Sequence, residues 1–400
     1  MRIISVIGIM ILLGLAQFSN AAWIIVPRDQ PTIQAGIDAA NASDTIVVDP
    51  GTYSGDGNRG IDFKGKNVAV RGAVWAGPVT IDCGGTAQSP QIAFNFHSGE
   101  DNRSLVRDVI IRNAYAGLSS DSGAIICRGA SPQIINCTVT NNHANGARVI
   151  YDAAPQFINC TFSHNAGNGI YVCHFYSPDA DLYITGSVID HNDSSGIFVH
   201  EPRSVYIANC TIVSNGAHGI MVEGMPPKQK AAELLQRTVV NTLSAYNRGY
   251  GMGSFFGYWG NILICSDSWG NNGGNYHSFT GDPAGFSFDP LFCDTTTGYL
   301  LAANSLCLAA NNHWCGATIG AFDSAGCTAV LLCGDIDGDA NVTVGDIVYL
   351  INYIFKGGPP PNTISMADVN NDGRVNVGDI VGLINYAFRQ QPIDCPPIIP

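Results

Sequence analysis

The chain has 400 residues, of which 46% are hydrophobic and 13% are charged, and its formal net charge is −13. With 32 acidic against 19 basic residues, it lacks the positive footprint that binding to nucleic acid or to an anionic membrane requires. Its 46 Gly and 20 Pro are too few for a disordered low-complexity chain. The length exceeds an ordinary domain of ~100–200 residues, which predicts two units, one of them large.

The N-terminus has the pattern of a secretory signal peptide. Arg2 precedes an apolar run from Ile3 to Leu15, and small residues follow at Ser19-Asn20-Ala21-Ala22. The apolar run is shorter than the about 20 residues that a membrane anchor needs. We therefore expect residues 1–22 to be removed and the mature protein to be secreted, without membrane insertion. Its 13 cysteines could then form disulfides, although the odd number leaves at least one thiol unpaired.

A short phrase recurs through the middle of the chain. The pattern Asn-x-x-x-Gly begins at six positions, 29, 23, 27, 23 and 32 residues apart: Asn113, Asn142, Asn165, Asn192, Asn215 and Asn247. Each unit joins a β-branched run to an Asn-Gly turn and a second short run. Such short strands bury their faces when coils stack, with ~4.8 Å between strands. The repeat predicts a mainly β protein built as a parallel β-helix; a β-sandwich is the alternative, although it requires no fixed repeat.

Segments at both ends of this region point to a family. Pro31-Thr-Ile-Gln-Ala-Gly-Ile-Asp and Asp44-Thr-Ile-Val-Val-Asp-Pro-Gly resemble the start of bacterial right-handed parallel β-helix proteins of the pectin lyase-like superfamily. Asp289-Pro-Leu-Phe-Cys and Ile319-Gly-Ala-Phe resemble their end. The resemblance implies a right-handed β-helix over residues 23–328, with a capping helix at about Ile33 to Ala40. The catalytic motifs of polygalacturonases have no counterpart, Ala217-His218-Gly219 being the nearest fragment to their Gly-His-Gly.

The register of the repeats assigns polar residues to structural positions. Five asparagines should stack at one corner and hydrogen-bond along the solenoid axis: Asn142, Asn165, Asn192, Asn215 and Asn247. Cys137, Cys160 and Cys210, with Ser187 between them, should fill one buried position, because no metal-ligand spacing accompanies them. Five later cysteines are better disulfide candidates, and their pairing stays open: Cys265, Cys293, Cys307, Cys315 and Cys327.

The same register predicts one face with functional side chains. Strand alternation should place Arg148, Tyr171, Phe198 and Met221 in one outward row, and Cys173, His200 and Glu223 in the next, with Glu201 at a strand end. Tyr171 and Phe198 could bind sugar rings, whereas His200, Glu201, Glu223 and Arg148 are candidate catalytic groups. Glycoside hydrolysis needs two carboxylates, and elimination needs a base beside a cation. The alternative is an aromatic pair that stabilises an exposed sheet without any ligand.

The C-terminal part contains two acidic loops, each followed by an amphipathic helix and spaced 33 residues apart. Hard oxygen ligands at loop positions 1, 3, 5, 7, 9 and 12 bind Ca²⁺, position 7 through its backbone carbonyl. These positions are filled in loop 1 by Asp335, Asp337, Asp339, Asn341, Thr343 and Asp346, and in loop 2 by Asp368, Asn370, Asp372, Arg374, Asn376 and Asp379. We therefore expect two calcium sites. Ala340 stands where the loop turn favours Gly, which weakens the case for loop 1.

The paired loop–helix repeats, with Asp at position 12 and no entering helices, resemble a type I dockerin, a small α-helical module with two calcium loops. The resemblance covers residues 335–395 and leaves 329–334 as a short linker. It implies a cohesin-type or cell-surface partner, contacted through helix residues that begin at Val344-Gly345 and Val377-Gly378. Cys333 and Cys395 flank the two repeats, and antiparallel helices would bring them together, which predicts a disulfide.

Two functions fit these features. The first is a secreted carbohydrate-active protein, a β-helix hydrolase or lyase that degrades a polysaccharide and is held on its partner by the dockerin. The second is a non-catalytic β-helix that adheres to a polysaccharide and is anchored in the same way. Dockerins usually occur in the same chain as enzymes that degrade plant polysaccharides, which favours the first function. The absence of the catalytic motifs of polygalacturonases favours the second.

Overall fold

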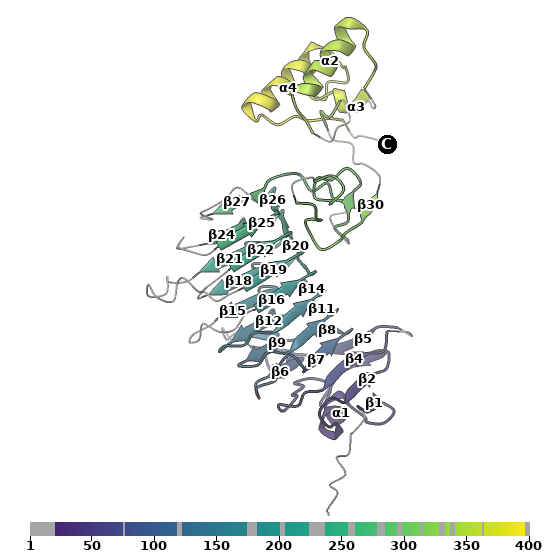
Figure 1. Cartoon of the computed structure of the whole chain (residues 1–400), viewed down its shortest axis with the longest axis vertical. Coiled ribbons are helices and arrows are strands. Elements are labelled where there is room, and N and C mark those ends of the chain that lie inside the picture. Colours follow the sequence, from purple (N-terminus) through teal and green to yellow (C-terminus); the bar gives the residue numbers. More distant parts are fainter. Residues whose placement is uncertain are drawn as a thin grey trace, which may run out of the picture.

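A computed structural model describes residues 21–74, 77–117, 122–173, 182–200, 205–223, 237–254, 261–277, 285–293, 298–312, 315–327, 333–336, 341–361 and 364–396. Its larger part is a solenoid of parallel strands, and a small helical module follows it in the chain (Figure 1). The predicted combination of a parallel β-helix and an α-helical C-terminal module is confirmed.

Three parallel sheets, A, B and C, form the walls of the solenoid. Sheet A contains β1 (Trp23–Val26), β2 (Thr45–Val48), β4 (Ala69–Gly72), β7 (Leu105–Arg107), β10 (Gln133–Ile135), β13 (Gln156–Ile158), β16 (Leu182–Thr185), β19 (Val205–Ala208), β22 (Arg237–Val240) and β25 (Asn261–Ile264). Sheet B contains β3 (Gly51–Tyr53), β5 (Val79–Asp82), β8 (Ile110–Arg112), β11 (Thr138–Thr140), β14 (Thr161–Ser163), β17 (Val188–Asp190), β20 (Thr211–Val213), β23 (Leu243–Ala245), β26 (Ser266–Trp269) and β28 (Gly285–Phe286). Sheet C contains β6 (Phe94–Phe96), β9 (Gly123–Arg128), β12 (Asn145–Ile150), β15 (Ile170–Cys173), β18 (Ile197–His200), β21 (Ile220–Glu223), β24 (Tyr250–Ser254) and β27 (Gly274–His277).

Alternation along each strand builds one continuous core. In sheet A, Ile134 pairs with Phe157, which pairs with Ile184, and all three side chains are fully buried. Their neighbours on each strand point outward, as the pleat requires. Each short strand would expose this apolar face in isolation, so coil stacking is what stabilises it.

The corner between sheets A and B explains the repeated Asn-Cys-Thr phrase. Asn136, Asn159 and Asn209 follow their sheet A strands and adopt positive φ angles of 53°, 52° and 52°. Asn tolerates the left-handed region better than most non-glycine residues, so it can turn the chain sharply into the next strand. The cysteine that follows is buried and lacks a disulfide. Cys137, Cys160 and Cys210 therefore fill the interior, as predicted, and Ser187 takes this place in the intervening coil.

A ladder of buried amides lines the corner between sheets B and C. The Nδ2 groups of Asn142, Asn165, Asn192 and Asn215 each donate to the Oδ1 of the next asparagine, at 2.9–3.0 Å. Asn247 continues the ladder by donating to Asn271 at 2.9 Å. Because each amide also donates to or accepts from backbone groups, the ladder satisfies the chain at a buried bend. Its structural role was predicted; its extension to Asn271 was not.

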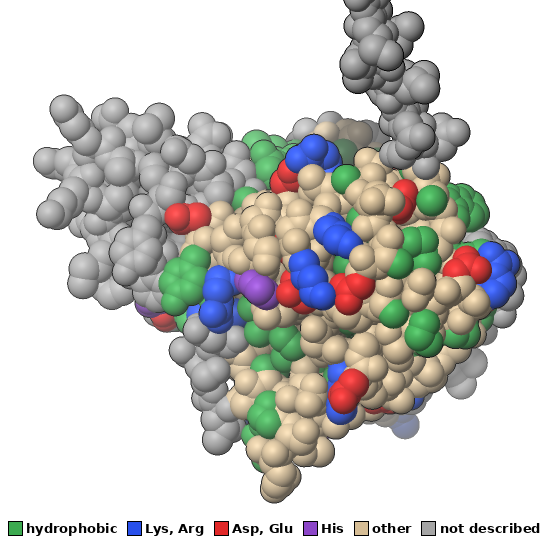
Figure 2. Space-filling model, turned by 90° about the horizontal axis from the view of Figure 1, so that it is seen from below, with side chains coloured by type: hydrophobic (Ala, Val, Ile, Leu, Met, Phe, Trp, Pro, Cys, Tyr) green, Lys and Arg blue, Asp and Glu red, His purple; other side chains and the backbone are tan. Residues whose placement is uncertain are grey.

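The N-terminal end of the solenoid is closed by helix α1 (Ile33–Ala39), close to the predicted capping helix. Ile33 and Ile37 are buried against the first coils. The Lys66 ammonium donates to three carbonyl oxygens near the helix C-terminus, at 2.8–2.9 Å, which satisfies its unpaired acceptors. Figure 2, which views this end of the molecule, shows side chains of opposite charge next to one another and scattered hydrophobic side chains.

Residues 285–327, described except for 294–297 and 313–314 and here called the closing segment, begin with β28 at the end of sheet B and then fold back over its outer face. They include two short strands, β29 (Leu301–Ala302) and β30 (Ala325–Cys327), which pair with each other. Tyr299, Leu301, Cys307, Leu308 and Ile319 form a second buried cluster with Val213, Leu243 and Ala245 of sheet B. Two disulfides, Cys265–Cys315 and Cys293–Cys327, secure the segment and resolve the pairing that the sequence left open.

The C-terminal module contains α2 (Val344–Lys356), α3 (Ile364–Ala367) and α4 (Val377–Arg389). Leu350 and Leu383, which occupy equivalent positions in α2 and α4, are fully buried in a common core. The predicted disulfide between Cys333 and Cys395 is present and joins the ends of the module. None of the described helices is long and apolar enough to span a membrane.

Candidate functional site

The outer face of sheet C carries the predicted rows. Strand pairing places Arg148 opposite Tyr171, Tyr171 opposite Phe198 and Phe198 opposite Met221. The next row places Cys173 beside His200 and His200 beside Glu223. The structure therefore brings five of the six predicted site residues onto one face. Glu201, the sixth, lies outside the described residues.

Arg148, Tyr171 and Phe198 form a stacked group. The Arg148 guanidinium carbon lies 4.0 Å from the centroid of the Tyr171 ring, and the Tyr171 and Phe198 ring centroids are 5.3 Å apart. Arg148 has an outward position on its strand but is only 2% exposed, whereas both rings are half-buried. Burial raises the pKa of Tyr171, and the Arg148 charge opposes that shift. Arg148 thus packs against the Tyr171 ring and is almost inaccessible to solvent.

His200 and Glu223 form the polar part of this face. His200 Nδ1 lies 3.8 Å from Glu223 Oε2, and both side chains are partly exposed. Within the strands of sheet C, Glu223 is the one carboxylate that the structure describes. A hydrolase with two carboxylates would therefore need a partner from outside these strands, such as Glu201. The imidazole and carboxylate together can accept and return a proton without a second carboxylate.

Three residues on this face were missed by the sequence analysis. The rings of His218 and Tyr250 stack at 5.5 Å, and those of Tyr250 and His277 at 4.4 Å. His218 Nδ1 accepts a hydrogen bond from the Tyr250 backbone N–H at 2.9 Å, which fixes the neutral ring. Burial lowers the pKa of His218, and the charge of Glu223 opposes that shift. A signal for this stack existed, because His218 and Tyr250 both immediately precede the glycine of an Asn-x-x-x-Gly repeat.

A second aromatic pair lies on sheet A. Tyr183 and Tyr206 are opposite each other on β16 and β19, with ring centroids 5.8 Å apart, and they are 38% and 37% exposed. Gln156 and Gln133 continue the same outward row, and the Gln133 side-chain amide donates to that of Gln156 at 2.9 Å. This row is uncharged, in contrast to the row of Arg148 on sheet C.

The second acidic loop of the C-terminal module has the arrangement expected for a calcium loop. Asp368 accepts hydrogen bonds from the backbone N–H groups of Asp372 and Gly373, at 3.0 and 2.9 Å. Asn376 caps helix α4 by accepting from Gly378 N–H, while Asp379 Oδ2 accepts from Asn376 N–H. Asp379, at position 12, thus both closes the loop and completes the capping box at the start of helix α4.

The buried oxygens in this loop fit a bound cation. Asp368 and Asp379, at positions 1 and 12, are buried, and Asp379 Oδ1 has no hydrogen-bond partner among the described residues. Burial and the charge of Asp368 both raise the pKa of Asp379, which a divalent cation between them would reverse. In the described part of the chain, no three His, Cys, Asp or Glu side chains alone are grouped to hold a metal. The site therefore depends on the amide and carbonyl oxygens of Asn370, Asn376 and Arg374 as well.

The first loop repeats this pattern where it is described. Asp335 and Asp346, at positions 1 and 12, are buried like their counterparts in loop 2. Asp346 Oδ1 accepts from Ile336 N–H at 2.6 Å, and Thr343 caps α2. Asn341 is described, whereas Asp337, Asp339 and Ala340 lie outside the described residues.

Comparison with known families agrees with both parts of the architecture. Residues 122–282 match the family "Right handed beta helix region", and residues 333–387 match "Dockerin type I domain". The chain is a right-handed parallel β-helix protein with a C-terminal type I dockerin. None of the curated proteins compared with it matches.

Among solved structures, the β-helix is similar to several proteins at low identity. Pectate lyase Pel9A shares 16% identity over 72% of this chain and 90% of its own, with a TM-score of 0.46. The A-modules of two Azotobacter vinelandii mannuronan C-5 epimerases, AlgE6 and AlgE4, each share 16% identity with a TM-score of 0.31. They cover 64% and 65% of this chain, and 93% and 77% of their own chains. At these scores the similarity carries no conclusion about activity.

The dockerin displays an apolar stripe on each of its two longer helices. Val348 on α2 and Val381 on α4 are half-exposed at equivalent positions, and Phe355 and Phe388 are 63% and 69% exposed. Val344 and Val377 begin the two stripes at loop position 10, where the resemblance predicted partner contacts. Exposed apolar side chains gathered in this way indicate a protein-binding surface.

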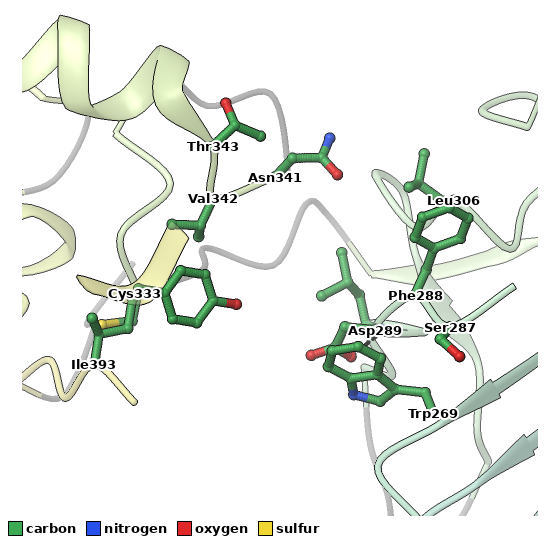
Figure 3. A pocket seen from close by; sticks show the side chains of 12 residues that line it. Trp269, Ser287, Phe288, Asp289, Leu306, Cys333, Asn341, Val342, Thr343 and Ile393 are labelled. Atoms are coloured by element: carbon green, nitrogen blue, oxygen red, sulfur yellow. Dashed lines mark hydrogen bonds between the residues drawn. The ribbon is translucent and has the colours of Figure 1, made fainter. Parts of the chain in front are cut away.

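A cavity of about 380 Å³ lies between the closing segment and the dockerin (Figure 3). Trp269, Phe288 and Asp289 line one side of it, and Val342 and Ile393 line the other. Among the lining residues that the structure describes, Asp289 is the single charged side chain. These described residues offer no acid–base pair, so sheet C is the better candidate for chemistry.

Proposed function

We propose that the protein is a secreted carbohydrate-active protein whose β-helix acts on a polysaccharide at the outer face of sheet C. The observation that carries this proposal is the convergence of aromatic rings, imidazoles and a carboxylate on consecutive coils of one face. Tyr171 and Phe198 offer surfaces for sugar rings, and His200 and Glu223 offer proton transfer beside them. The disulfides are consistent with an extracellular location, and a signal peptide at residues 1–22 would direct the chain there.

Two reactions are open to this face. Hydrolysis would use Glu223 with Glu201 as its carboxylate partner. Elimination or a related proton abstraction would use His200 as the base, with Glu223 orienting the imidazole. In the second case Arg148 acts indirectly, because its guanidinium is buried against the Tyr171 ring. The single described carboxylate on the strands of sheet C favours the second reaction.

The two reactions leave different products. Hydrolysis of a polysaccharide releases reducing ends alone, whereas elimination also creates an unsaturated sugar that absorbs ultraviolet light. Incubating the full-length protein with neutral and acidic polysaccharides and measuring both signals distinguishes them. Loss of both signals in His200→Ala or Glu223→Gln would support this site. Full activity in both variants would place the chemistry elsewhere.

Non-catalytic binding is a second candidate, and the exposed Tyr183–Tyr206 pair on sheet A favours it. An uncharged row of amides and tyrosines, with one residue per coil, suits adhesion to a neutral polysaccharide and offers no acid or base. This alternative predicts retention on an insoluble neutral glycan without any released product. Substituting Tyr183 and Tyr206 with Ala should then abolish the retention, whereas Tyr171→Ala should leave it unchanged.

We further propose that the dockerin binds Ca²⁺ in both loops and attaches the protein to a cohesin or a similar surface partner. The buried carboxylates at positions 1 and 12 of each loop support the calcium sites, because burying ionised groups without a counter-charge is unfavourable. The paired apolar stripes support a protein partner. Val348→Asp combined with Val381→Asp should abolish capture by a cohesin panel while Ca²⁺ binding persists. Wild-type protein that captures no cohesin in Ca²⁺ would contradict the partner class.

A further inference from the structure

The outward row of sheet B changes character along the solenoid. Thr138, Thr140, Thr161 and Ser163 are its outward residues on β11 and β14. From β20 onward most outward side chains are apolar, namely Val213, Leu243, Ala245 and Trp269, although Thr211 and Asp267 also occupy outward positions. An exposed apolar strip over several coils would promote association. This half of the sheet therefore needs a cover, whereas the first half does not.

The closing segment supplies that cover by direct contact. Ile319, Leu301 and Leu308 pack against the apolar strip. Gly320 N–H donates to Asn241 O at 2.8 Å, and Ala321 N–H donates to Thr211 Oγ1 at 3.0 Å.

The closing segment is hydrogen-bonded to sheet B at β17, where the outward row passes from polar to mainly apolar side chains. The Tyr299 hydroxyl donates to Asp190 Oδ2 at 2.9 Å and lies 3.0 Å from His191 Nδ1. Asp190 lies on β17, between the polar and the apolar parts of the row. The segment thus ends its coverage where the sheet surface becomes polar.

The two disulfides hold the cover in different ways. Cys265 lies at the end of β25, so its bond to Cys315 ties the segment to the solenoid. Cys293–Cys327 closes the segment on itself, around β29 and β30. Among the described residues, one backbone–backbone hydrogen bond joins the segment beyond β28 to the solenoid, from Gly320 N–H to Asn241 O. Its position on the sheet therefore depends on the Cys265–Cys315 bond together with apolar packing, whereas the Cys293–Cys327 bond stabilises the fold of the segment itself.

Of the five cysteines in this region, four form these two bonds, and Cys307 is the one left over. Its side chain is fully buried between the cover and sheet B, and its Sγ lies 3.7 Å from Asp267 Oδ2. Asp267 is also fully buried and accepts a hydrogen bond from Phe288 N–H at 2.9 Å. Burial and the adjacent Asp267 carboxyl raise the pKa of the Cys307 thiol well above its usual value. Because the thiolate is the attacking species in disulfide exchange, this thiol is kept unreactive.

We propose that residues 285–327 are a disulfide-locked cover that completes the β-helix only in an oxidising environment, and that Asp267 keeps Cys307 unpaired among the five cysteines of this region. Each disulfide forms when two thiols lose two electrons and two protons. In exchange with glutathione disulfide, those electrons reduce its sulfur–sulfur bond to two glutathione thiols. Until both bonds form, the apolar strip of sheet B is open to solvent and to other chains.

The locking role is tested with full-length protein in Ca²⁺ by limited proteolysis and binding of a hydrophobic dye. Cys265→Ser/Cys315→Ser should increase cleavage within residues 285–327 on the order of tenfold or more, with increased dye binding. The matched control, Cys333→Ser/Cys395→Ser, removes a disulfide of the dockerin and should leave cleavage of the closing segment unchanged. If the first variant does not fold, mild reduction of folded wild-type protein provides the same comparison. Equal cleavage of the segment with and without its disulfides would overturn the proposal.

The selection of Cys307 is tested by refolding the reduced full-length chain in a glutathione buffer and mapping its disulfides by mass spectrometry. Asp267→Asn should raise the fraction of Cys307 in non-native disulfides several-fold, whereas Asp323→Asn, an exposed control in the same segment, should not. Cys307→Ser should reach both native bonds with an equal or higher yield. Native pairing in Asp267→Asn at the wild-type level, or failed pairing in Cys307→Ser, would refute the role of Asp267.

Discussion

The guanidinium carbon of Arg148 lies 4.0 Å from the centroid of the Tyr171 ring, in the same outward row of sheet C. A cation at this distance is attracted to the face of an aromatic ring, more strongly when water is excluded. Because Arg148 is only 2% exposed, the ring forms part of the environment that makes its burial tolerable. Tyr171 therefore has a structural partner whether or not a sugar binds to it.

Replacing Tyr171 with Leu should destabilise the β-helix by about 2 kcal/mol, because the buried charge of Arg148 loses its aromatic partner. Tyr171→Phe retains the ring and should cost less than about 1 kcal/mol. Chemical denaturation of both variants measures the difference. Equal destabilisation by Leu and Phe would show that the ring contributes nothing to the burial of Arg148.

The buried carboxyl of Asp267 should make stability depend on pH. Burial raises its pKa to about 7, so between about pH 4 and 7 the folded state retains a proton that the unfolded state has released. The free energy of unfolding should therefore fall as the pH rises through this range, by at most about 4 kcal/mol from this group. Denaturation at pH 5 and pH 8 should show a smaller fall in Asp267→Asn than in wild type. An identical fall in both proteins would be inconsistent with this assignment.

Interrupting the amide ladder should lower the free energy of unfolding substantially. Asn165 is fully buried, donates to Val139 O and Asn192 Oδ1, and accepts from Asn142. Asn165→Ala leaves buried donors and acceptors unpaired and should destabilise by about 2–4 kcal/mol. Thr161→Val, an outward substitution on β14, should stay within about 0.5 kcal/mol. Similar unfolding midpoints for the two variants would argue against a structural role of the ladder.

Calcium removal should unfold the dockerin while the β-helix stays intact. Among the described helices, α2, α3 and α4 of the dockerin have 13, 4 and 13 residues, against 7 for α1 of the β-helix, so the helical signal in circular dichroism reports mainly on the dockerin. A chelator should remove most of that signal, and Ca²⁺ should restore it. Asp368→Ala should reduce the Ca²⁺ stoichiometry by one without touching the cap of α4. A helical signal that persists in chelator would refute calcium-dependent folding.

The period of the repeat predicted the register of the solenoid. Arg148, Tyr171, Phe198 and Met221 lie opposite one another as expected, because inward and outward positions alternate strictly once one residue of a strand is assigned. Asn271 escaped notice because the residue four positions later is Asn275, not Gly, so the repeat pattern is broken there. The ladder nevertheless continues, since Asn275 accepts a hydrogen bond from the Asn271 amide.

The repeat pattern could not predict how deeply an outward side chain is buried or which distant segment covers sheet B. Strand alternation gives the direction of Arg148 but not what lies over it, so its depth was missed. The closing segment packs on strands that precede it by up to about 110 residues, and nothing local encodes the contact of Tyr299 with Asp190. The outward residues of sheet B change from Thr138 and Thr161 to Val213 and Leu243. Once the register is known, this change to apolar side chains indicates in the sequence that another segment covers the later strands.

The most direct test of the central claim is turnover of a polysaccharide by the full-length protein, compared with Glu223→Gln. The account predicts that wild-type protein releases reducing or unsaturated ends from at least one polysaccharide in a broad panel. Glu223→Gln should lose that activity while keeping its stability within about 1 kcal/mol, since the side chain is partly exposed. Asp323→Asn, an exposed carboxylate on the closing segment, should remain fully active. Unchanged turnover by Glu223→Gln would contradict the proposal that the sheet C face performs the chemistry.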